Sequence, residues 1–340
     1  MASAPAPRLP RLPLADGPTP VEALPGLSAP GCALWVKRDD LTQHVYGGNK
    51  VRKLEYLLED ARVRGAKRLV TVGAVGSHHV LATTYFGAKA GFEVEAVLVP
   101  QPRTDHVVEV LRADLGLGLR AFPVGSWAAV PWTLLARVAS GATLIPLGGS
   151  SAVGTAGYID AGRELAEQVR RGALPEPDVC VVALGSGGTA AGLAVGFAAA
   201  GLRTRVVGVC VSAPPWALGV SARHLARVSS RDAGASTPRV KLETDTRFLG
   251  AGYGCPTPEG EEATALARVH GGLTLDPTYT AKAFACALWF VRARRASTIL
   301  YWHTLSSAPM APLLAAGPDE RDIPATLIAL AVRAPASLVR

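Results

Sequence analysis

Short runs rich in valine, isoleucine and leucine alternate with helical patterns along most of the chain. The run at 68–73 precedes a helical pattern at 77–90, and the run at 94–99 precedes one at 105–115. Further examples are the runs at 142–147, 178–184, 205–211 and 298–302 and the helical patterns at 156–169, 189–200 and 279–292. Because the runs are continuously apolar, we expect parallel sheets that helices cover on both faces. The sequence therefore predicts an α/β protein with two such layers.

Composition narrows the possible functions. The chain has 340 residues, half of them hydrophobic, which suffices for one large domain or two ordinary ones. Its formal charge of +8 would suit nucleic acid. The basic residues are scattered, however, and no stripe interleaves them with aromatic residues, so we expect no nucleic-acid partner. The five cysteines are odd in number, widely spaced and mostly in apolar runs, which argues against a disulfide framework and a metal site and favours the reducing cytoplasm.

We expect no export signal and no membrane span. The first residues contain prolines where a signal peptide would need an apolar helical core. The almost wholly apolar stretch 181–200 is long enough to suggest a membrane helix. A glycine turn at 185–188 divides it into a short strand and a helix that is too short to cross a bilayer.

Lys50 lies in the first turn of a predicted amphipathic helix. Gly47 and Gly48 precede this helix, and its apolar stripe comprises Val51, Leu54, Leu57 and Leu58. The positive end of the helix dipole tends to lower the pKa of an amine there, which suits a lysine that forms a Schiff base. A solvated lysine at a helix start is the alternative explanation.

A second motif, 181–192, reads as a strand that enters a glycine turn and opens a helix. Such a turn presents backbone N–H groups and a helix dipole to a phosphate. Gly185, Gly187 and Ala190 also satisfy a dinucleotide fingerprint, but no Asp or Glu follows before Arg231 to hold a ribose. A bare phosphate therefore fits better. An NADP site and a purely structural glycine turn stay open as alternatives.

A helix-start lysine and a phosphate loop together suggest pyridoxal phosphate. The chain resembles, over nearly its full length, the family of D-cysteine desulfhydrases and 1-aminocyclopropane-1-carboxylate (ACC) deaminases, which are fold-type II enzymes that use this cofactor. The matching stretches are WVKRDDL (35–41), GGNKVRKLE (47–55), PLGGSS (146–151), GSGGT (185–189), GYG (252–254), LDPTYT (275–280) and HT (303–304).

The resemblance implies a fold and a set of roles. It implies two doubly wound three-layer α/β/α domains with the active site between them, and a homodimer. Residues 1–49 and 157–340 would form the large cofactor-binding domain, and 50–156 the small one. Lys50 would be the imine lysine, Thr304 would lie beside the pyridine nitrogen, and Ser77 would act as a base unless it is simply an N-cap. The expected phosphate ligands are Lys53, Gly185, Ser186, Gly187, Gly188 and Thr189, and the expected substrate residues include Tyr253, Tyr279 and His79.

The chain departs from the family pattern at several positions. His78 stands where the family has an asparagine beside the cofactor's ring hydroxyl, so it is a candidate for both cofactor and substrate binding. Leu305 and Ser306 replace two glycines and would reshape the substrate pocket. Thr280 follows Tyr279 where ACC deaminases tend to carry Glu, which favours thiol elimination over ring opening.

The sequence therefore predicts a pyridoxal-phosphate lyase that acts on a small amino acid, of the D-cysteine desulfhydrase type, releasing pyruvate, sulfide and ammonia. ACC deamination, L-cysteate sulfo-lyase activity and a specialised β-elimination or replacement are alternatives within the fold. A non-catalytic paralogue that binds the cofactor and an NADP-binding oxidoreductase are alternatives from other classes.

Overall fold

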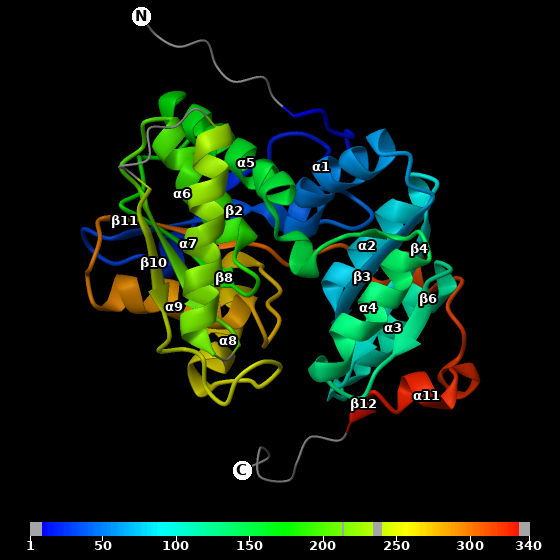
Figure 1. Cartoon of the computed structure of the whole chain (residues 1–340). Helices are drawn as coiled ribbons and strands as arrows, with labels where there is room; N and C mark the ends of the chain where they lie inside the picture. The colour runs from blue at the N-terminus through cyan, green and yellow to red at the C-terminus, as the bar shows by residue number, and fades with distance from the viewer. Residues whose placement is uncertain (1–8, 213, 234–239, 333–340) are drawn as a thin grey trace, which may run out of the picture. The chain divides into compact units, whose positions relative to one another are not determined.

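The computed structural model describes residues 9–212, 214–233 and 240–332 (Figure 1). The chain divides into two compact units. The large unit contains Ala15–Tyr56 and Ser150–Ala308, and the small unit contains Pro10–Leu14, Leu57–Gly149 and the described residues from Pro309 onward. These bounds differ from the expected ones chiefly at the C-terminal end, where residues after Ala308 cluster with the small unit.

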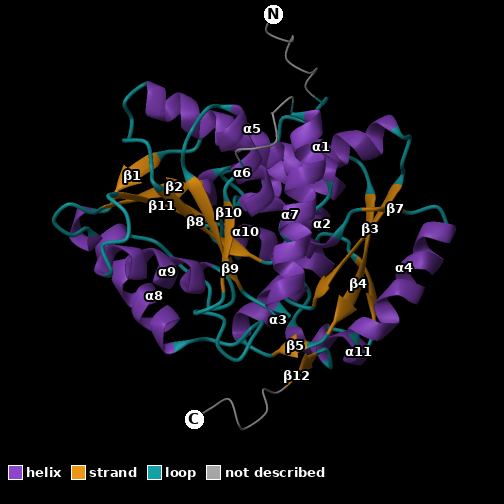
Figure 2. Ribbon diagram, turned by 60° about the vertical axis from the view of Figure 1, so that its left-hand side comes forward, coloured by secondary structure: helices purple, strands orange, loops and turns teal. Residues whose placement is uncertain are grey.

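The large unit is built on a sheet that, among the described residues, has six strands in the order β1-β2-β11-β8-β9-β10 (Figure 2). Strand β1 pairs antiparallel with β2, and the remaining neighbours are parallel. The strands are β1 Val21–Ala23, β2 Ala33–Arg38, β8 Val179–Leu184, β9 Arg205–Cys210, β10 Leu242–Asp245 and β11 Thr298–His303.

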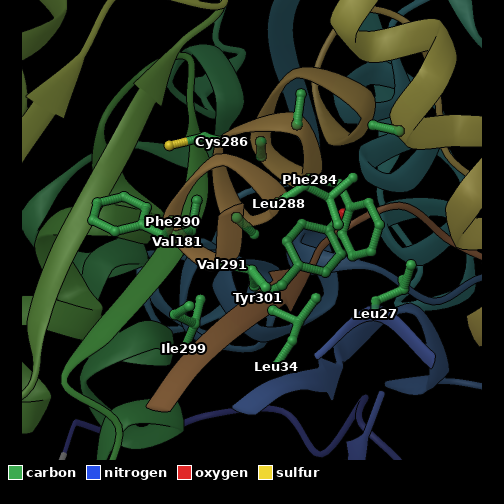
Figure 3. Close-up of a cluster of buried hydrophobic side chains, with 14 of the residues drawn as sticks. Leu27, Leu34, Val181, Phe284, Cys286, Leu288, Phe290, Val291, Ile299 and Tyr301 are labelled. Carbon is green, nitrogen blue, oxygen red and sulfur yellow. The ribbon is translucent and has the colours of Figure 1, made fainter. Parts of the chain in front are cut away.

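Helices cover both faces of this sheet. On β8 and β11, Val181 and Tyr301 join one hydrophobic cluster, whereas their neighbours Val182 and Trp302 join another. The first cluster packs against α8 (Pro258–Gly271) and α9 (Thr280–Arg292), and Figure 3 shows its side chains. The second packs against α5 (Ala152–Arg170), α6 (Gly188–Ala199) and α7 (Pro215–Asp232). Adjacent strand residues point to opposite faces, so the two clusters establish three layers.

The small unit repeats this plan on a parallel sheet with the order β6-β4-β3-β7 among the described residues. Its strands are β3 Arg68–Ala74, β4 Glu93–Val99, β6 Arg120–Pro123 and β7 Thr143–Leu144, and β5 Gln101–Pro102 pairs separately with β12 Ala331–Val332. Its helices are α2 His78–Lys89, α3 Asp105–Gly116, α4 Val130–Ala139, α10 Ala311–Leu314 and α11 Ala325–Ile328. Helix α1 (Asn49–Val63) begins in the large unit and ends in the small one.

The predicted α/β fold with parallel, helix-covered sheets is confirmed. One predicted strand is much shorter than expected, because the run at 142–147 forms only the two-residue β7 and then the 3₁₀ helix Leu147–Gly149. Pro146 cannot donate a backbone hydrogen bond and ends the pairing. Other 3₁₀ helices are Pro25–Leu27, Asp39–Leu41, Trp127–Ala129 and Glu320–Asp322. In the described ranges, no helix combines the length and apolarity that a membrane crossing requires.

Candidate cofactor site

The turn before α1 needs both of its glycines. Gly48 has a φ of +89°, and a Cβ there would lie 2.8 Å from the carbonyl oxygen of Thr304. A Cβ at Gly47 would lie 2.1 Å from the carbonyl oxygen of Asp40. The Gly48 N–H donates to the Asp39 carbonyl at 2.9 Å, and the next N–H, of Asn49, donates to Thr304 at 3.0 Å. Close backbone contacts therefore fix where α1 starts and where Lys50 emerges.

Lys50 is a partly buried amine with a lowered pKa. Its Nζ donates to Asn49 Oδ1 at 2.7 Å. Burial lowers the pKa of Lys50 to about 8, and the negative charge of Asp276 opposes this shift. Burial is thus the leading cause of the lowered pKa, whereas the sequence argument had invoked the helix dipole. A larger neutral fraction near pH 7 makes the amine more nucleophilic towards an aldehyde.

The predicted glycine loop connects β8 to α6. Gly187 has a φ of +99°, and a Cβ there would lie 3.1 Å from the backbone of Ala222. No side chain of the loop caps α6. Instead, the Gly188 N–H donates to Ser150 Oγ at 3.0 Å, and this hydroxyl lies 2.7 Å from Ser186 Oγ. The helix start therefore presents N–H and hydroxyl groups together, as phosphate binding requires.

Lys53 adds a buried amine to this loop. Its side chain is 2% exposed, and its Nζ lies 3.4 Å from Ser150 Oγ. Burial lowers the pKa of Lys53 well below its usual value, and the charge of Lys50 adds to the effect. A phosphate beside Lys53 would restore its charge and accept the loop's donors, so the residues present fit a phosphorylated aldehyde. Asn49 Nδ2 donates to Thr189 Oγ1 at 3.2 Å and joins the lysine turn to the loop.

Two tyrosines lie against the same loop. The ring of Tyr279 would be 3.2 Å from a Cβ at Gly185. Its hydroxyl donates to the Tyr253 hydroxyl at 3.0 Å, and the two rings meet edge to face at 84°. Burial raises the pKa of both phenols. Because Tyr279 donates to Tyr253, the Tyr253 proton remains for another acceptor.

The segment after β11 supports the lysine turn. The Thr304 carbonyl accepts from Asn49, as described above, and Thr304 follows the buried His303, whose Nδ1 lies 3.0 Å from the Tyr301 hydroxyl. Ser306 Oγ accepts from the Gly47 N–H at 2.9 Å. The serine that replaces a family glycine therefore stabilises the turn that carries Lys50. Leu305 is partly buried beside it.

Contacts within the small unit explain in part the positions of the Ser77 and His79 side chains. Ser77 is the N-cap of α2, and its Oγ accepts from the N–H groups of His79 at 3.3 Å and Val80 at 3.5 Å. Thr71 Oγ1 donates to the Ile145 carbonyl at 2.9 Å, so the contact between Thr71 Oγ1 and His79 Nε2 at 2.9 Å requires a proton on that nitrogen. The N-cap explanation of Ser77 is confirmed, and its role as a base stays a prediction.

His78 contacts a second histidine. Its Nε2 lies 2.9 Å from His106 Nε2, with the ring centroids 5.0 Å apart. His106 Nδ1 lies 3.4 Å from Glu109 Oε2. With a proton on His106 Nδ1, towards the carboxylate, His106 Nε2 accepts from His78 Nε2. In the described part of the chain, no group of three or more His, Cys, Asp or Glu could hold a metal ion.

The sequence reasoning missed a buried charge cluster beneath the lysine turn. Arg52 donates to Asp39 at 2.9 Å and to Glu164 at 2.8 Å. Tyr158 and Trp302 each donate to Asp39 Oδ2 at 2.7 Å. Other contacts that were not anticipated involve Lys37, Asn49, Ser150 and Asp276. All of these residues except Tyr158, Glu164 and Trp302 lie inside the matched motifs. Their place in those motifs was the sequence signal that could have identified them.

Comparisons with known proteins show the family of the chain. The family model "Pyridoxal-phosphate dependent enzyme" matches residues 12–304. A D-cysteine desulfhydrase of Salmonella paratyphi A is 36% identical over 87% of this chain and 94% of its own. The nocardicin C-9' epimerase of Nocardia uniformis is 36% identical over 92% of this chain and 97% of its own. The solved structure of an ACC deaminase homologue, 31% identical, covers 91% of this chain and 96% of its own with a TM-score of 0.78. The chain therefore belongs to the family of pyridoxal-phosphate dependent enzymes, and pyridoxal 5'-phosphate is its cofactor.

Proposed function

We propose that the protein is a lyase of the D-cysteine desulfhydrase type, which converts D-cysteine and water to pyruvate, sulfide and ammonia. The observation that carries the proposal is Lys50, an amine with a pKa of about 8 that is joined through Asn49 to the glycine loop. The Salmonella relative supports the choice of substrate.

Thr280 favours a desulfhydrase over an ACC deaminase. It is buried, and its hydroxyl donates to Asp276 Oδ2 at 2.6 Å while it accepts from the Asp276 N–H at 2.7 Å. The position that tends to be Glu in ACC deaminases is thus a neutral residue with its hydrogen bonds made within the chain. This supports thiol elimination.

The chain's own residues provide binding and proton transfer. Bound pyridoxal phosphate supplies an electron sink for the electron pair that proton removal leaves on the substrate. Lys53, the Ser150 and Ser186 hydroxyls and the start of α6 would hold the phosphate. Lys50 Nζ takes and returns a proton, because its lowered pKa keeps a neutral fraction near pH 7. The Tyr253 hydroxyl, protonated at neutral pH, donates to the departing sulfur or to the substrate carboxylate.

Other assignments rest on the resemblance and stay proposals. Ser77 would assist proton removal, and Thr304 would lie beside the ring nitrogen, where a neutral hydroxyl would disfavour protonation and so favour elimination. His78, His79 and Leu305 belong to the substrate or cofactor surroundings. The protein acts as a homodimer in the cytoplasm on a small amino acid.

Colour and product assays test the proposal. The purified protein should be yellow, and borohydride should abolish the visible band. D-Cysteine should release sulfide and pyruvate, whereas L-cysteate and ACC should yield little sulfite or 2-oxobutanoate. Lys50→Ala should lose the borohydride-sensitive band, and the exposed Lys67→Ala should keep it. A colourless protein that pyridoxal phosphate does not reconstitute would contradict the proposal. Release of 2-oxobutanoate from ACC would instead identify ACC as the substrate.

Epimerisation at an amino-acid stereocentre is a second candidate. The Nocardia epimerase matches nearly the whole of both chains. An epimerase needs a proton acceptor on one face of a carbon and a proton donor on the other, and Lys50 would supply one of the two. Exchange of the substrate α-proton for deuterium, with inversion and no sulfide, would favour it.

A further inference from the structure

Helix α9 contains a fully buried lysine that the proposed reaction does not use. Lys282 is 0% exposed and has the apolar neighbours Ala281 and Ala283. Its Nζ donates to the carbonyl oxygens of Leu249 at 2.8 Å and Gly252 at 2.7 Å. Burial lowers the pKa of Lys282. A buried lysine is unfavourable unless its donors are satisfied, so these two contacts explain its position.

The segment that Lys282 holds is irregular. Gly250, Gly252 and Gly254 all have positive φ values. The segment's own backbone hydrogen bonds are long, from Gly252 N–H to Leu249 at 3.3 Å and from Cys255 N–H to Gly252 at 3.4 Å. The two shorter bonds from Lys282 carry a charged donor and are the stronger ones. The conformation of 249–255 therefore depends on the ammonium group of Lys282.

Both tyrosines of the site lie close in sequence to residues that this lysine connects. Tyr253 directly follows Gly252, whose carbonyl accepts from Lys282. Tyr279 precedes Lys282 by one helical turn and immediately precedes α9. The same ammonium group thus connects the loop of Tyr253 to the helix that follows Tyr279. The distance of 3.0 Å between the two hydroxyls is set across this connection.

We propose that Lys282 is a positioning residue that sets the Tyr253–Tyr279 hydroxyl pair by fastening the loop 249–255 to α9. Its contribution to turnover rests on the proposed function of that pair. The contribution of Lys282 to loop order does not rest on that function, and it can be measured without substrate or cofactor.

Cys255 provides a direct readout of loop order. It is the one partly exposed cysteine, because Cys32, Cys180, Cys210 and Cys286 are buried. Lys282→Met keeps the length of the side chain and removes its donors. Iodoacetamide should alkylate Cys255 about tenfold faster in Lys282→Met than in the unmodified protein, as expected for a loop that opens more often. Mass spectrometry should show that the four buried cysteines stay protected. Unchanged alkylation of Cys255 in folded Lys282→Met overturns the proposal.

A double-substitution cycle tests whether Lys282 acts through Tyr253. Tyr253→Phe and Lys282→Met should each lower kcat on the substrate identified above by about tenfold or more, with a smaller change in KM. The double variant should be no slower than the worse single variant, because both remove the same interaction. If the two losses in kcat multiply in the double variant, the proposal is overturned even if Cys255 alkylation is faster. If the protein proves inactive on every substrate, the proposed function fails and the alkylation result still decides the positioning role.

Phe284→Leu is the matched control. Phe284 is buried on the same helix and packs edge to face on Tyr301. This substitution should lower the melting temperature without accelerating alkylation of Cys255, and its effect on kcat should multiply with that of Tyr253→Phe. If Lys282→Met does not fold, Lys282→Gln retains a shorter donor. An intermediate alkylation rate in Lys282→Gln supports the proposal, and an unchanged rate overturns it.

Discussion

Helices α6 and α2 follow parallel strands in the two units, yet their first turns are organised differently. In the large unit, α6 begins at the glycine loop without a side-chain cap from its N-cap residue. In the small unit, Ser77 caps α2 and accepts from two of its N–H groups. An uncapped start leaves donors for a ligand, whereas a capped start has already satisfied some of them. At α6 the Gly188 N–H donates to Ser150 Oγ from outside the helix, so the two helix starts differ in where their hydrogen-bond acceptor comes from.

Buried carboxylates show a related contrast. Asp39 in the large unit is fully buried, and the Arg52 guanidinium is the main group that holds the pKa of this carboxyl below its usual value against the effect of burial. Asp114 in the small unit is equally buried, and burial raises its pKa well above the usual range. Among the described residues, no ion pair involves Asp114. Charge is therefore compensated at Asp39, beneath the lysine turn, whereas the raised pKa of Asp114 favours its neutral form.

Removal of the Asp39 charge should have the largest effect. Asp39→Asn leaves Arg52 and Lys37 with a reduced negative partner and should cost about 3–5 kcal/mol of unfolding free energy. Chemical denaturation at pH 7 measures it. Glu243→Gln, at an exposed ion pair with Arg205, is the control and should change stability by less than about 1 kcal/mol. A loss of similar size in both variants would show that burial does not distinguish the Asp39–Arg52 pair from an exposed ion pair.

Crowding the open helix start should weaken cofactor binding. Gly187→Val places a side chain at a φ of +99° against Ala222 and should lower affinity for pyridoxal phosphate about 100-fold, as expected for a displaced charged hydrogen-bond network. Equilibrium titration of the visible band measures the change. Gly201→Val also substitutes a glycine with positive φ, but in open space after α6. It should reduce stability and leave the affinity within about twofold.

The pKa of Lys50 predicts how cofactor attachment depends on pH. Only the neutral amine attacks an aldehyde, so the attachment rate should rise about tenfold per pH unit up to about pH 8 and then level off. Stopped-flow absorbance of the cofactor-free protein measures this rate. A plateau that begins only near pH 10.5 would show that burial does not lower the pKa of Lys50.

Removing the cap of α2 should have a moderate, local effect. Ser77→Ala should cost about 1 kcal/mol of unfolding free energy, because two N–H groups lose their acceptor. Ser77→Asp should retain the cap. If Ser77 is also the base, both variants should lose activity while only Ser77→Ala loses stability. Full activity in Ser77→Asp would show that Ser77 acts only as the N-cap of α2.

Asp114→Asn should have the smallest effect on stability and the opposite sign to Asp39→Asn. The folded pKa of Asp114 is raised, so its stability contribution is present below the unfolded pKa and is lost as pH rises towards the folded pKa. The variant should therefore resemble the unmodified protein near pH 4 and be more stable, by up to about 1 kcal/mol, near pH 8. Melting curves at both values test this. Lower stability at pH 8 would show that Asp114 has a compensating partner.

Local motifs predicted much of the fold and the cofactor. Alternating apolar runs and helical periodicities predicted the parallel sheets, because burial on both faces leaves a direct trace in the sequence. The glycine loop was identified because a phosphate turn needs consecutive small residues. Lys50 was identified because Gly47 and Gly48 place it at the start of a helix. Ser150 could not be assigned, because its contact with Gly188 joins residues 38 positions apart.

The sequence by itself determined the α/β architecture, the glycine turn before α1 and the family, since these depend on short-range patterns. The tertiary structure decided how the polar groups are compensated: the lowered pKa of Lys50 through burial, the Asp39–Arg52 pair, the contact between His78 and His106, and the hydrogen bond from Lys282 to Gly252 beside Tyr253. Burial and hydrogen-bond partners arise only when distant segments pack together. Local sequence cannot specify them for that reason.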